Sequence, residues 1–265
     1  MQRVHALWMY RSFVAGMVKR EFQGRYTRSV LGSLWAIIEP LSMILVYSVI
    51  FSKLMAARFP GFDSQWAFTI YICSGIIAWE FFTEVITRSQ NMFIEHASLL
   101  KKTSFPRVTL PVIALTTATI NFIIIFSIYL CFLAIIGELP SYKLLFAWIP
   151  LLIIQQGIAI GLGLIIGTLN VFFRDIGQAM QIILRFWFWL TPIVYPFKIL
   201  PDFIKDLVLN FNPMALFVMS YHKIMLYKEF PIFSDFKLHI LLMLSLIFIG
   251  SFFFVRLSPE MVDEL

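Results

Sequence analysis

The chain has 265 residues, of which 60% are hydrophobic, 17% aromatic and 14% charged. Soluble domains carry about 25% charged residues, so this composition excludes an ordinary soluble protein and indicates an integral membrane protein. The formal net charge is +6. No soluble basic domain is present to hold nucleic acid, so we attribute this charge to membrane topology and expect no nucleic-acid partner.

Residues 1–29 are predicted to form a cytoplasmic amphipathic helix. Lys19, Arg20 and Gln23 fall on one side of this helix, and apolar residues fall on the other with helical spacing. Such a helix lies in the membrane interface, with its basic side toward the anionic headgroups of membrane lipids. A solvated basic terminus is the alternative. The apolar side consists of Tyr10, Phe13, Val14, Met17 and Val18.

Six continuous apolar runs are long enough to cross a bilayer, since roughly 20 helical residues span ~30 Å of hydrocarbon. A β-barrel is disfavoured because its strands would alternate in polarity. We therefore predict an all-α integral membrane protein in which residues 1–265 form a single transmembrane domain. The expected spans are residues 31–51, 66–86, 108–136, 144–173, 176–195 and 238–255.

The placement of Lys and Arg predicts that both termini are cytoplasmic, because cytoplasmic loops carry the excess of these residues. With the N-terminus inside, more of them fall on the inner side, and those outside are diluted over a long loop. Cys73 and Cys131 fall within expected spans. Neither is placed to form a disulfide in an outer loop.

The last external segment, residues 196–237, has an apolar part over residues 207–226. Asn210, Asn212 and Pro213 interrupt this part, which is therefore too broken to span the bilayer. We predict short re-entrant helices that dip into the outer leaflet, where protein or a water-filled cavity shelters their backbone. An amphipathic surface helix is the alternative.

Four ionisable residues, Glu39, Glu80, Glu84 and Arg185, fall within expected spans. Such groups are expensive in hydrocarbon and by default face the bundle interior. A pair between Arg185 and one of the glutamates would fix helix register, whereas Glu80 and Glu84 can also snorkel to the interface. An ion-coupled secondary transporter is thus one alternative function, although we find no inverted repeat to support it.

Aromatic residues gather in and just after the fifth expected span. Sugar rings present apolar C–H faces that stack on aromatic rings, so such residues suit a polysaccharide conduit. The alternative is an interfacial belt, which accounts for most Trp and Tyr residues in membrane proteins. The candidates for glycan contact are Tyr47, Trp79, Trp187, Trp189 and Tyr195.

Motifs for catalysis and metal binding are absent from the sequence, which has no phosphate-binding loop, zinc-binding helix motif or nucleophile elbow. We therefore expect no catalytic residue, metal site or cofactor in this chain. Energy for uphill transport must come from an ion gradient or from a separate ATP-hydrolysing subunit. An enzyme acting on lipid-linked sugars is a further alternative, but its carboxylates or histidines would have to cluster, and here they are dispersed.

Five short motifs follow one another along the chain. They are RYxRSxLGxLW from Arg25, LLKKxxFPRxxLP from Leu99, NVFFRDI from Asn170, TPIVYP from Thr191 and NPM from Asn212. Each is weak alone, but all five resemble, in the same order, motifs of the permease subunits of polysaccharide-exporting ABC transporters. The resemblance covers most of the chain and is to the O-antigen and teichoic-acid exporter type.

This resemblance implies a homodimer of six-span permeases in the bacterial inner membrane, bound to two nucleotide-binding ATPase subunits. ATP and Mg²⁺ would bind to those partners and not to this chain. The implied substrate is a polysaccharide linked to undecaprenyl diphosphate, which passes through a continuous channel. We expect O-antigen as the cargo, with teichoic acid or another cell-surface glycan as the alternative.

In the resembling family a short coupling helix docks on the ATPase, and it corresponds here to about residues 91–102. The loop with Arg174 and Asp175 is expected to be a second contact or a support. By charge alone, Arg25 and Arg28 are candidates for contact with the lipid diphosphate. The turn Phe105-Pro106-Arg107 is expected to be a stiff joint. The coupling candidates are Asn91, Glu95, Lys101, Lys102, Arg174 and Asp175.

Overall fold

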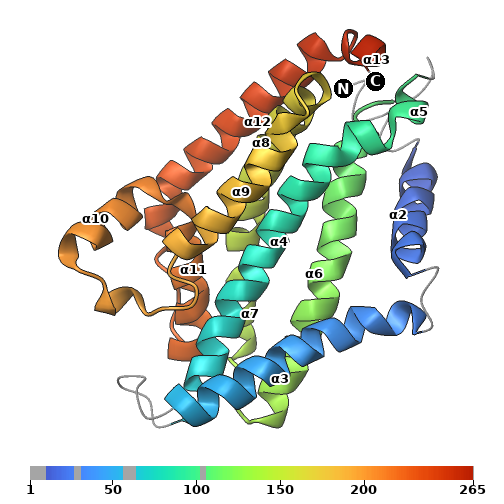
Figure 1. The fold of residues 1–265 in the computed structure, drawn as a ribbon. Coiled ribbons are helices and arrows are strands. Elements are labelled where there is room, and N and C mark those ends of the chain that lie inside the picture. Colours follow the sequence, from blue (N-terminus) through green and yellow to red (C-terminus); the bar gives the residue numbers. More distant parts are fainter. Residues whose placement is uncertain (1–9, 27–30, 56–63, 102–105, 265) are drawn as a thin grey trace.

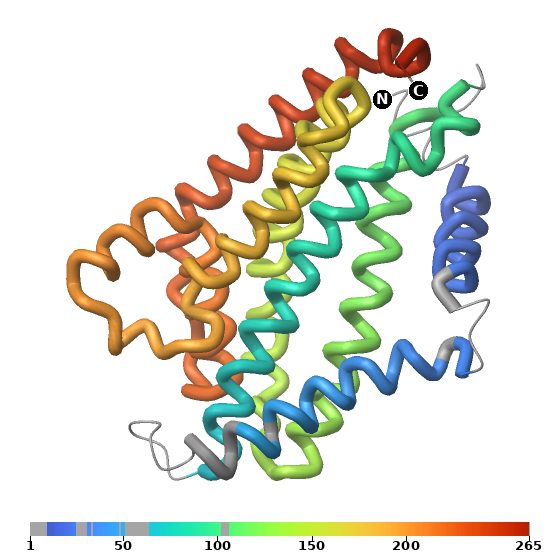
Figure 2. The backbone as a smooth tube through the Cα atoms, viewed as in Figure 1, coloured from blue at the N-terminus to red at the C-terminus, as the bar shows by residue number. Residues whose placement is uncertain are grey.

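The computed structural model describes residues 10–26, 31–55, 64–101 and 106–264, and this part of the chain is almost entirely helical, with no strand. Long helices run between two ends of the molecule (Figures 1 and 2). We call one of them the coupling end, defined by residues 91–101, 173–175 and 258–264. At the opposite end lie α7 (Tyr142–Phe146) and the start of α4 (Ala67–Glu95).

Four helical stretches are long and apolar enough to cross a membrane. They are α4, α6 (Thr109–Ile135), α7 together with α8 (Trp148–Phe172), and α12 (Lys237–Leu257) with the short turn before it. These confirm four of the expected spans as helices. The helix α3 (Trp35–Met55) has only a shorter apolar stretch in its described part, and α9 (Asp175–Leu190) has 16 residues, so the count of six spans stays a prediction.

Glycines on α8 let the neighbouring helices approach its backbone on two sides. A Cβ at Gly167 would lie 2.3 Å from the carbonyl oxygen of Ser89 on α4. On the other side, a Cβ at Gly161 would lie 2.8 Å from the carbonyl carbon of Leu246 on α12. Small residues at helix contacts are the usual route to tight packing in lipid, where the hydrophobic effect does not drive helices together. The scaffold of the molecule is therefore α4, α8 and α12.

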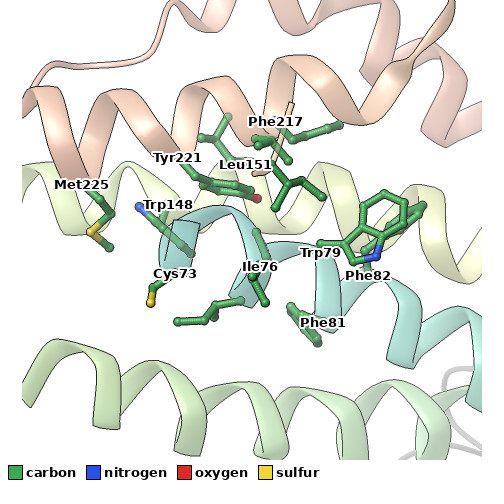
Figure 3. Packing of buried hydrophobic residues seen from close by; sticks show 14 of the residues in the cluster. Cys73, Ile76, Trp79, Phe81, Phe82, Trp148, Leu151, Phe217, Tyr221 and Met225 are labelled. Atoms are coloured by element: carbon green, nitrogen blue, oxygen red, sulfur yellow. The ribbon is translucent and has the colours of Figure 1, made fainter. Parts of the chain in front are cut away.

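Aromatic and amide side chains join α4 and α8 to α11 (Pro213–His222), and Figure 3 shows the hydrophobic residues of this packing. The rings of Trp148 and Tyr221 lie 4.3 Å apart. The Tyr221 hydroxyl donates to Oε1 of Gln155 over 2.6 Å, and Nε2 of Gln155 donates to the Ala78 carbonyl over 3.1 Å. Both polar groups are thus satisfied inside an apolar core, which fixes the position of α11.

The N-terminal helix α2 (Arg11–Tyr26) has the predicted amphipathic pattern. Val14 and Val18 are buried, whereas Lys19, Arg20 and Gln23 are exposed. The helix contacts α6 and runs alongside it in Figure 1. Part of its apolar stripe therefore packs on protein, and its position in the membrane interface stays a prediction.

The external segment divides into an exposed helix and a buried one. In α10 (Asp202–Phe211) the buried residue is Val208, whereas most of α11 is buried. Asn212 joins the two, because its Oδ1 accepts from the backbone N–H of Met214 over 3.0 Å and so caps α11. The surface-helix alternative thus fits α10 and is wrong for α11. Re-entry into the bilayer stays a prediction.

Cys73 is buried on α4 and Cys131 is exposed on α6, and both are free thiols. The expectation that they form no disulfide is confirmed.

Candidate functional site

The predicted coupling segment lies where α4 ends and turns into the short helix α5 (Ala97–Leu100). Glu95 and Lys101 are exposed and Asn91 is partly exposed, while the buried side chain of Leu100 holds α5 to the bundle. Lys102 lies outside the described residues. The segment therefore presents charged side chains on a helix that is anchored from behind.

The turn between α8 and α9 exposes Arg174 and Asp175 at the same end of the molecule (Figure 1). Phe173 beside them is 65% exposed, and sequence reasoning did not single it out. An apolar ring next to two charges is typical of a surface that is covered by a partner, because the ring gains from burial and the charges gain from pairing.

Three hydrogen bonds connect this turn to α4. Nδ2 of Asn170 donates to the Gln90 carbonyl over 3.1 Å, and the N–H of Gly177 donates to Oδ1 of Asn170 over 2.9 Å. Nε2 of Gln90 donates to the Gly177 carbonyl over 3.2 Å. Gln90 directly precedes Asn91, whereas Asn170 and Gly177 closely flank Arg174 and Asp175. The two predicted contact segments are therefore mechanically linked. The motif NVFFRDI contains Asn170, but its spacing does not reveal the partner on α4.

Arg107, from the turn expected to be a stiff joint, is bonded to the end of α12. Its guanidinium donates to the carbonyl of Ser258 and, over 2.6 Å, to the Ser258 hydroxyl. The C-terminal turn α13 (Met261–Glu264) follows directly. A proline turn alone does not predict this bond, which ties the start of α6 to the C-terminal segment. Phe105 lies outside the described residues.

A cleft of about 460 Å³ lies between α3, α4 and α6, and charged residues line it. Arg88 donates through Nε to Glu84 over 2.9 Å and through a terminal nitrogen to Glu21 of α2 over 3.0 Å. Nδ2 of Asn121 on α6 donates to the other oxygen of Glu84 over 2.8 Å. This cluster joins three helices, and sequence reasoning missed it because Glu21 and Asn121 are far from Glu84 along the chain.

The expected pair between Arg185 and a glutamate is not formed among the described residues. Glu84 pairs with Arg88, and Arg185 lies on the exposed side of α9. Glu39 and Glu80 line the cleft described above and are also exposed. The i,i+4 spacing of Glu84 and Arg88 is visible in the sequence, and such a neighbour on the same helix face reaches Glu84 before a residue of another span does.

One side of α9 packs on the bundle and the other is open. Gly177, Met180 and Leu184 are buried, whereas the opposite side combines a cation, an amide and aromatic rings. An arginine at the centre of a lipid-facing helix costs about 2.5–3.5 kcal/mol on insertion scales. The open side of α9 is thus better suited to water or protein than to lipid. We call it the α9 face, and it comprises Gln178, Ile182, Arg185, Phe186 and Trp189.

The aromatic candidates for glycan contact fall into two groups. Trp79 is 4% exposed, and its ring lies edge-on to Trp187 at 5.9 Å, so it belongs to the core and cannot touch a polymer. This corrects the prediction for Trp79. Trp187 is partly buried and donates from Nε1 to Oδ1 of Asn212 over 2.8 Å.

The second group faces outward. Trp189 is 65% exposed on the α9 face, and the partly exposed Tyr195 donates from its hydroxyl to the Trp189 carbonyl over 3.0 Å. Tyr47 on α3 is partly exposed. Hydropathy could not separate these residues from Trp79, because aromatic side chains suit a core and an open face equally.

The candidates for contact with a lipid diphosphate stay predictions. Arg25 lies in the last turn of α2, but its side chain is outside what the structure describes, and so is the whole of Arg28. Within the described ranges, no group of three or more His, Cys, Asp or Glu residues is arranged to hold a metal ion.

Several bilayer-length helices, an open face of mixed polarity and a charged end define a multi-pass membrane protein with surfaces for partners. Residues 14–226 match the family model described as "ABC-2 type transporter". This match covers most of the chain, which therefore belongs to the ABC-2 type transporter family.

Three curated relatives illustrate the similarity. The chain is 30% identical over 209 residues to an O-antigen export system permease protein of Klebsiella pneumoniae, with 78% of each chain covered. It is 28% identical over 229 residues to a protein of the same name from Myxococcus xanthus, covering 86% of this chain and 85% of the relative. A polysialic acid transport protein of Escherichia coli is 24% identical over 196 residues, or 71% of each chain.

Proposed function

We propose that this chain is the transmembrane permease of an ATP-driven exporter that moves a lipid-linked polysaccharide, with O-antigen as the expected cargo. The names of the relatives from Klebsiella and Myxococcus support the polysaccharide class. The chain would act as a homodimer in the inner membrane, with both termini in the cytoplasm. Teichoic acid or a capsule-type glycan is the alternative cargo, and the relative named for polysialic acid supports the latter.

ATP hydrolysis is assigned to a separate subunit, because the sequence has no phosphate-binding loop. Two copies of that ATPase, with their ATP and Mg²⁺, would dock on the coupling end. Asn91, Glu95 and Lys101 would provide one contact, and Arg174 with Asp175 the second. Lys102 would extend the first contact.

The hydrogen bonds behind these contacts support transmission of movement. Gln90, Asn170 and Gly177 join the two contact segments, so a push on either one reaches both α4 and α9. Arg107 passes the same movement to the end of α12. Rigid linked helices are what a closure of the ATPases needs in order to shift spans as bodies.

The polarity of the α9 face is the single observation that best supports a channel formed by two copies of this chain. Arg185 is exposed on it together with Phe186 and Trp189, and lipid is a poor solvent for this combination. Two copies that bring their α9 faces together would enclose a path with aromatic rings for sugar faces and an arginine for anionic groups. Tyr47, Trp187 and Tyr195 are the further glycan-contact candidates.

The lipid end of the substrate would enter beside α2. Arg25 and Arg28 are proposed to contact the diphosphate of the undecaprenyl carrier, because two guanidinium groups match the geometry and charge of phosphates.

Depletion of the protein in its host tests this proposal. Undecaprenyl-linked glycan should accumulate on the cytoplasmic side while surface glycan disappears, and the retained glycan would identify the cargo. Re-expression of the unaltered chain serves as the control. An unchanged glycan distribution would contradict the exporter and return the ion-coupled transporter to consideration.

A further inference from the structure

A second open site lies at the outer end of the molecule, away from the α9 face. A cleft of about 290 Å³ is formed by the start of α4, the segment after α9 and the end of α11. Its lining includes the aromatic rings of Tyr71, Phe197 and Tyr227. The ring of His222 is buried against Tyr71, with centroids 3.6 Å apart. The cleft therefore has fixed, flat apolar walls.

The Tyr71 side chain is held in place from behind. Its hydroxyl lies 3.1 Å from the Pro192 carbonyl oxygen and 2.9 Å from that of Tyr195. Both acceptors belong to the TPIVYP motif, which thus shapes this cleft. Tyr71 is buried, so it forms the fixed floor of the cleft, and the partly exposed rings of Phe197 and Tyr227 are the ones that a ligand can reach.

Two lysines line the same cleft without a carboxylate partner. Lys198 lies over the ring of Tyr227, with Nζ 5.9 Å from its centroid. Lys223, which directly follows α11, also lines the cleft. Neither forms an ion pair with any residue whose placement the structure gives. Glu229 is the one carboxylate in the lining, so the two ammonium groups leave an excess of positive charge.

Two other lysines of the external segment are neutralised. Lys205 donates to Asp202 over 2.9 Å, and this ammonium group lowers the pKa of the Asp202 carboxyl below its usual value. Lys228 donates to Glu138 over 2.6 Å. Lys198 and Lys223, beside the aromatic walls, form no such pair with a described residue and are available to an external anion.

We propose that this cleft binds one acidic sugar unit of the exported glycan, through stacking on the partly exposed rings of Phe197 and Tyr227 and through contacts of Lys198 and Lys223 with its anionic group. The volume is at the lower end of small-molecule sites, which suits one or two sugar rings and not a longer polymer. This inference rests on the proposed export of a polysaccharide. It adds a site within each protomer that would hold acidic glycans as they leave.

The test uses the permease purified with its ATPase in lipid nanodiscs of phosphatidylcholine. The probe is tetragalacturonate, and its methyl ester is a matched neutral probe with the same rings. Binding of each is measured by calorimetry. We expect the acid to bind roughly tenfold more tightly than the ester, because charge-assisted hydrogen bonds are the stronger ones.

Substitutions locate the binding. The double change Lys198→Gln and Lys223→Gln should reduce binding of the acid to the level of the ester, and Tyr227→Leu should weaken both probes. Lys205→Gln is the matched control and should change neither. Equal binding of the two probes, or an acid preference that survives the double change, would overturn the proposal. Thermal unfolding of each variant shows whether a loss reflects the site or the fold.

An anionic lipid headgroup would offer the same charge. Repeating the measurement with phosphatidylglycerol in the nanodiscs separates the two sources, and full displacement of tetragalacturonate would assign the cleft to lipid and overturn the glycan site. A negative result for this acidic-sugar site would not contradict the proposed export function, which depletion of the protein tests separately. A chain that lacks this site should still cause cytoplasmic accumulation of glycan when it is depleted.

Discussion

The consecutive helices α8 and α9 are both apolar, yet they are used in opposite ways. Glycines on α8 bring α4 and α12 into backbone contact, and much of the helix is enclosed. By contrast, α9 buries Gly177, Met180 and Leu184 and leaves Arg185 and Trp189 exposed. This difference teaches that α8 stabilises the helix bundle by its packing, whereas α9 leaves one side exposed.

The largest effect on stability is expected at Trp79, and substitution of Trp189 provides the contrast. Trp79→Ala should destabilise the protein by about 3–5 kcal/mol, because it empties a filled core position. Trp189→Ala should leave stability nearly unchanged and slow glycan export. Thermal unfolding and surface glycan are measured for both variants. Normal export by Trp189→Ala would leave only an interfacial role for that ring.

Two glycines sharpen the same comparison. Gly167→Ala should cost about 1–3 kcal/mol, since the new Cβ would meet the Ser89 carbonyl oxygen. Gly16→Ala on α2 is the matched control, because nothing lies within 4 Å of that position, and alanine is there the better helix former. The unfolding temperatures of the two variants report the difference. A neutral Gly167→Ala would mean that α4 and α8 can separate at little cost.

Breaking the link between the contact segments should affect coupling. Asn170→Ala leaves the carbonyl of Gln90 and the N–H of Gly177 without their partner, at a cost of about 1–3 kcal/mol. We expect ATP hydrolysis to continue while export per ATP falls. Gln181→Ala, which removes a weak bond to Thr87 on the same pair of helices, is the control. Export that stays proportional to hydrolysis would contradict the proposed link.

The smallest effect is expected at the coupling surface. Lys101→Glu should weaken copurification of the ATPase several-fold without unfolding the chain, since Lys101 is exposed. Lys143→Glu changes an exposed lysine within α7 at the opposite end and should have no effect. Unchanged copurification of the Lys101 variant would remove the coupling assignment.

The positions of helices were predictable from sequence where the length and hydropathy of an apolar run determine where the helix begins and ends. The expected span 108–136 corresponds to Thr109–Ile135 almost residue for residue. The second span was expected to end at residue 86, yet α4 continues to Glu95. Arg88 and Gln90 are polar, but each has a hydrogen-bond partner on another helix, and such partners are invisible to a local pattern.

The candidate site was predictable only in outline. The family motifs pointed to residues 91–102 and to the Arg174 turn, and their described parts lie at one end with exposed charges, while the coupling role stays a prediction. The cluster of Glu21, Glu84 and Arg88 depends on contacts between distant segments. The burial of Trp79 likewise depends on which way α4 faces its neighbours, and composition alone does not determine this.

Water access to the α9 face tests the central claim most directly. Arg185→Cys is made in a chain whose two native cysteines are replaced by serine, and the assembled transporter is treated with a charged thiol reagent. Leu241→Cys, at an exposed apolar position of α12, is the lipid-facing control. We predict rapid labelling at position 185 and none at 241. Equal protection of both positions would show that α9 faces lipid and would contradict the channel.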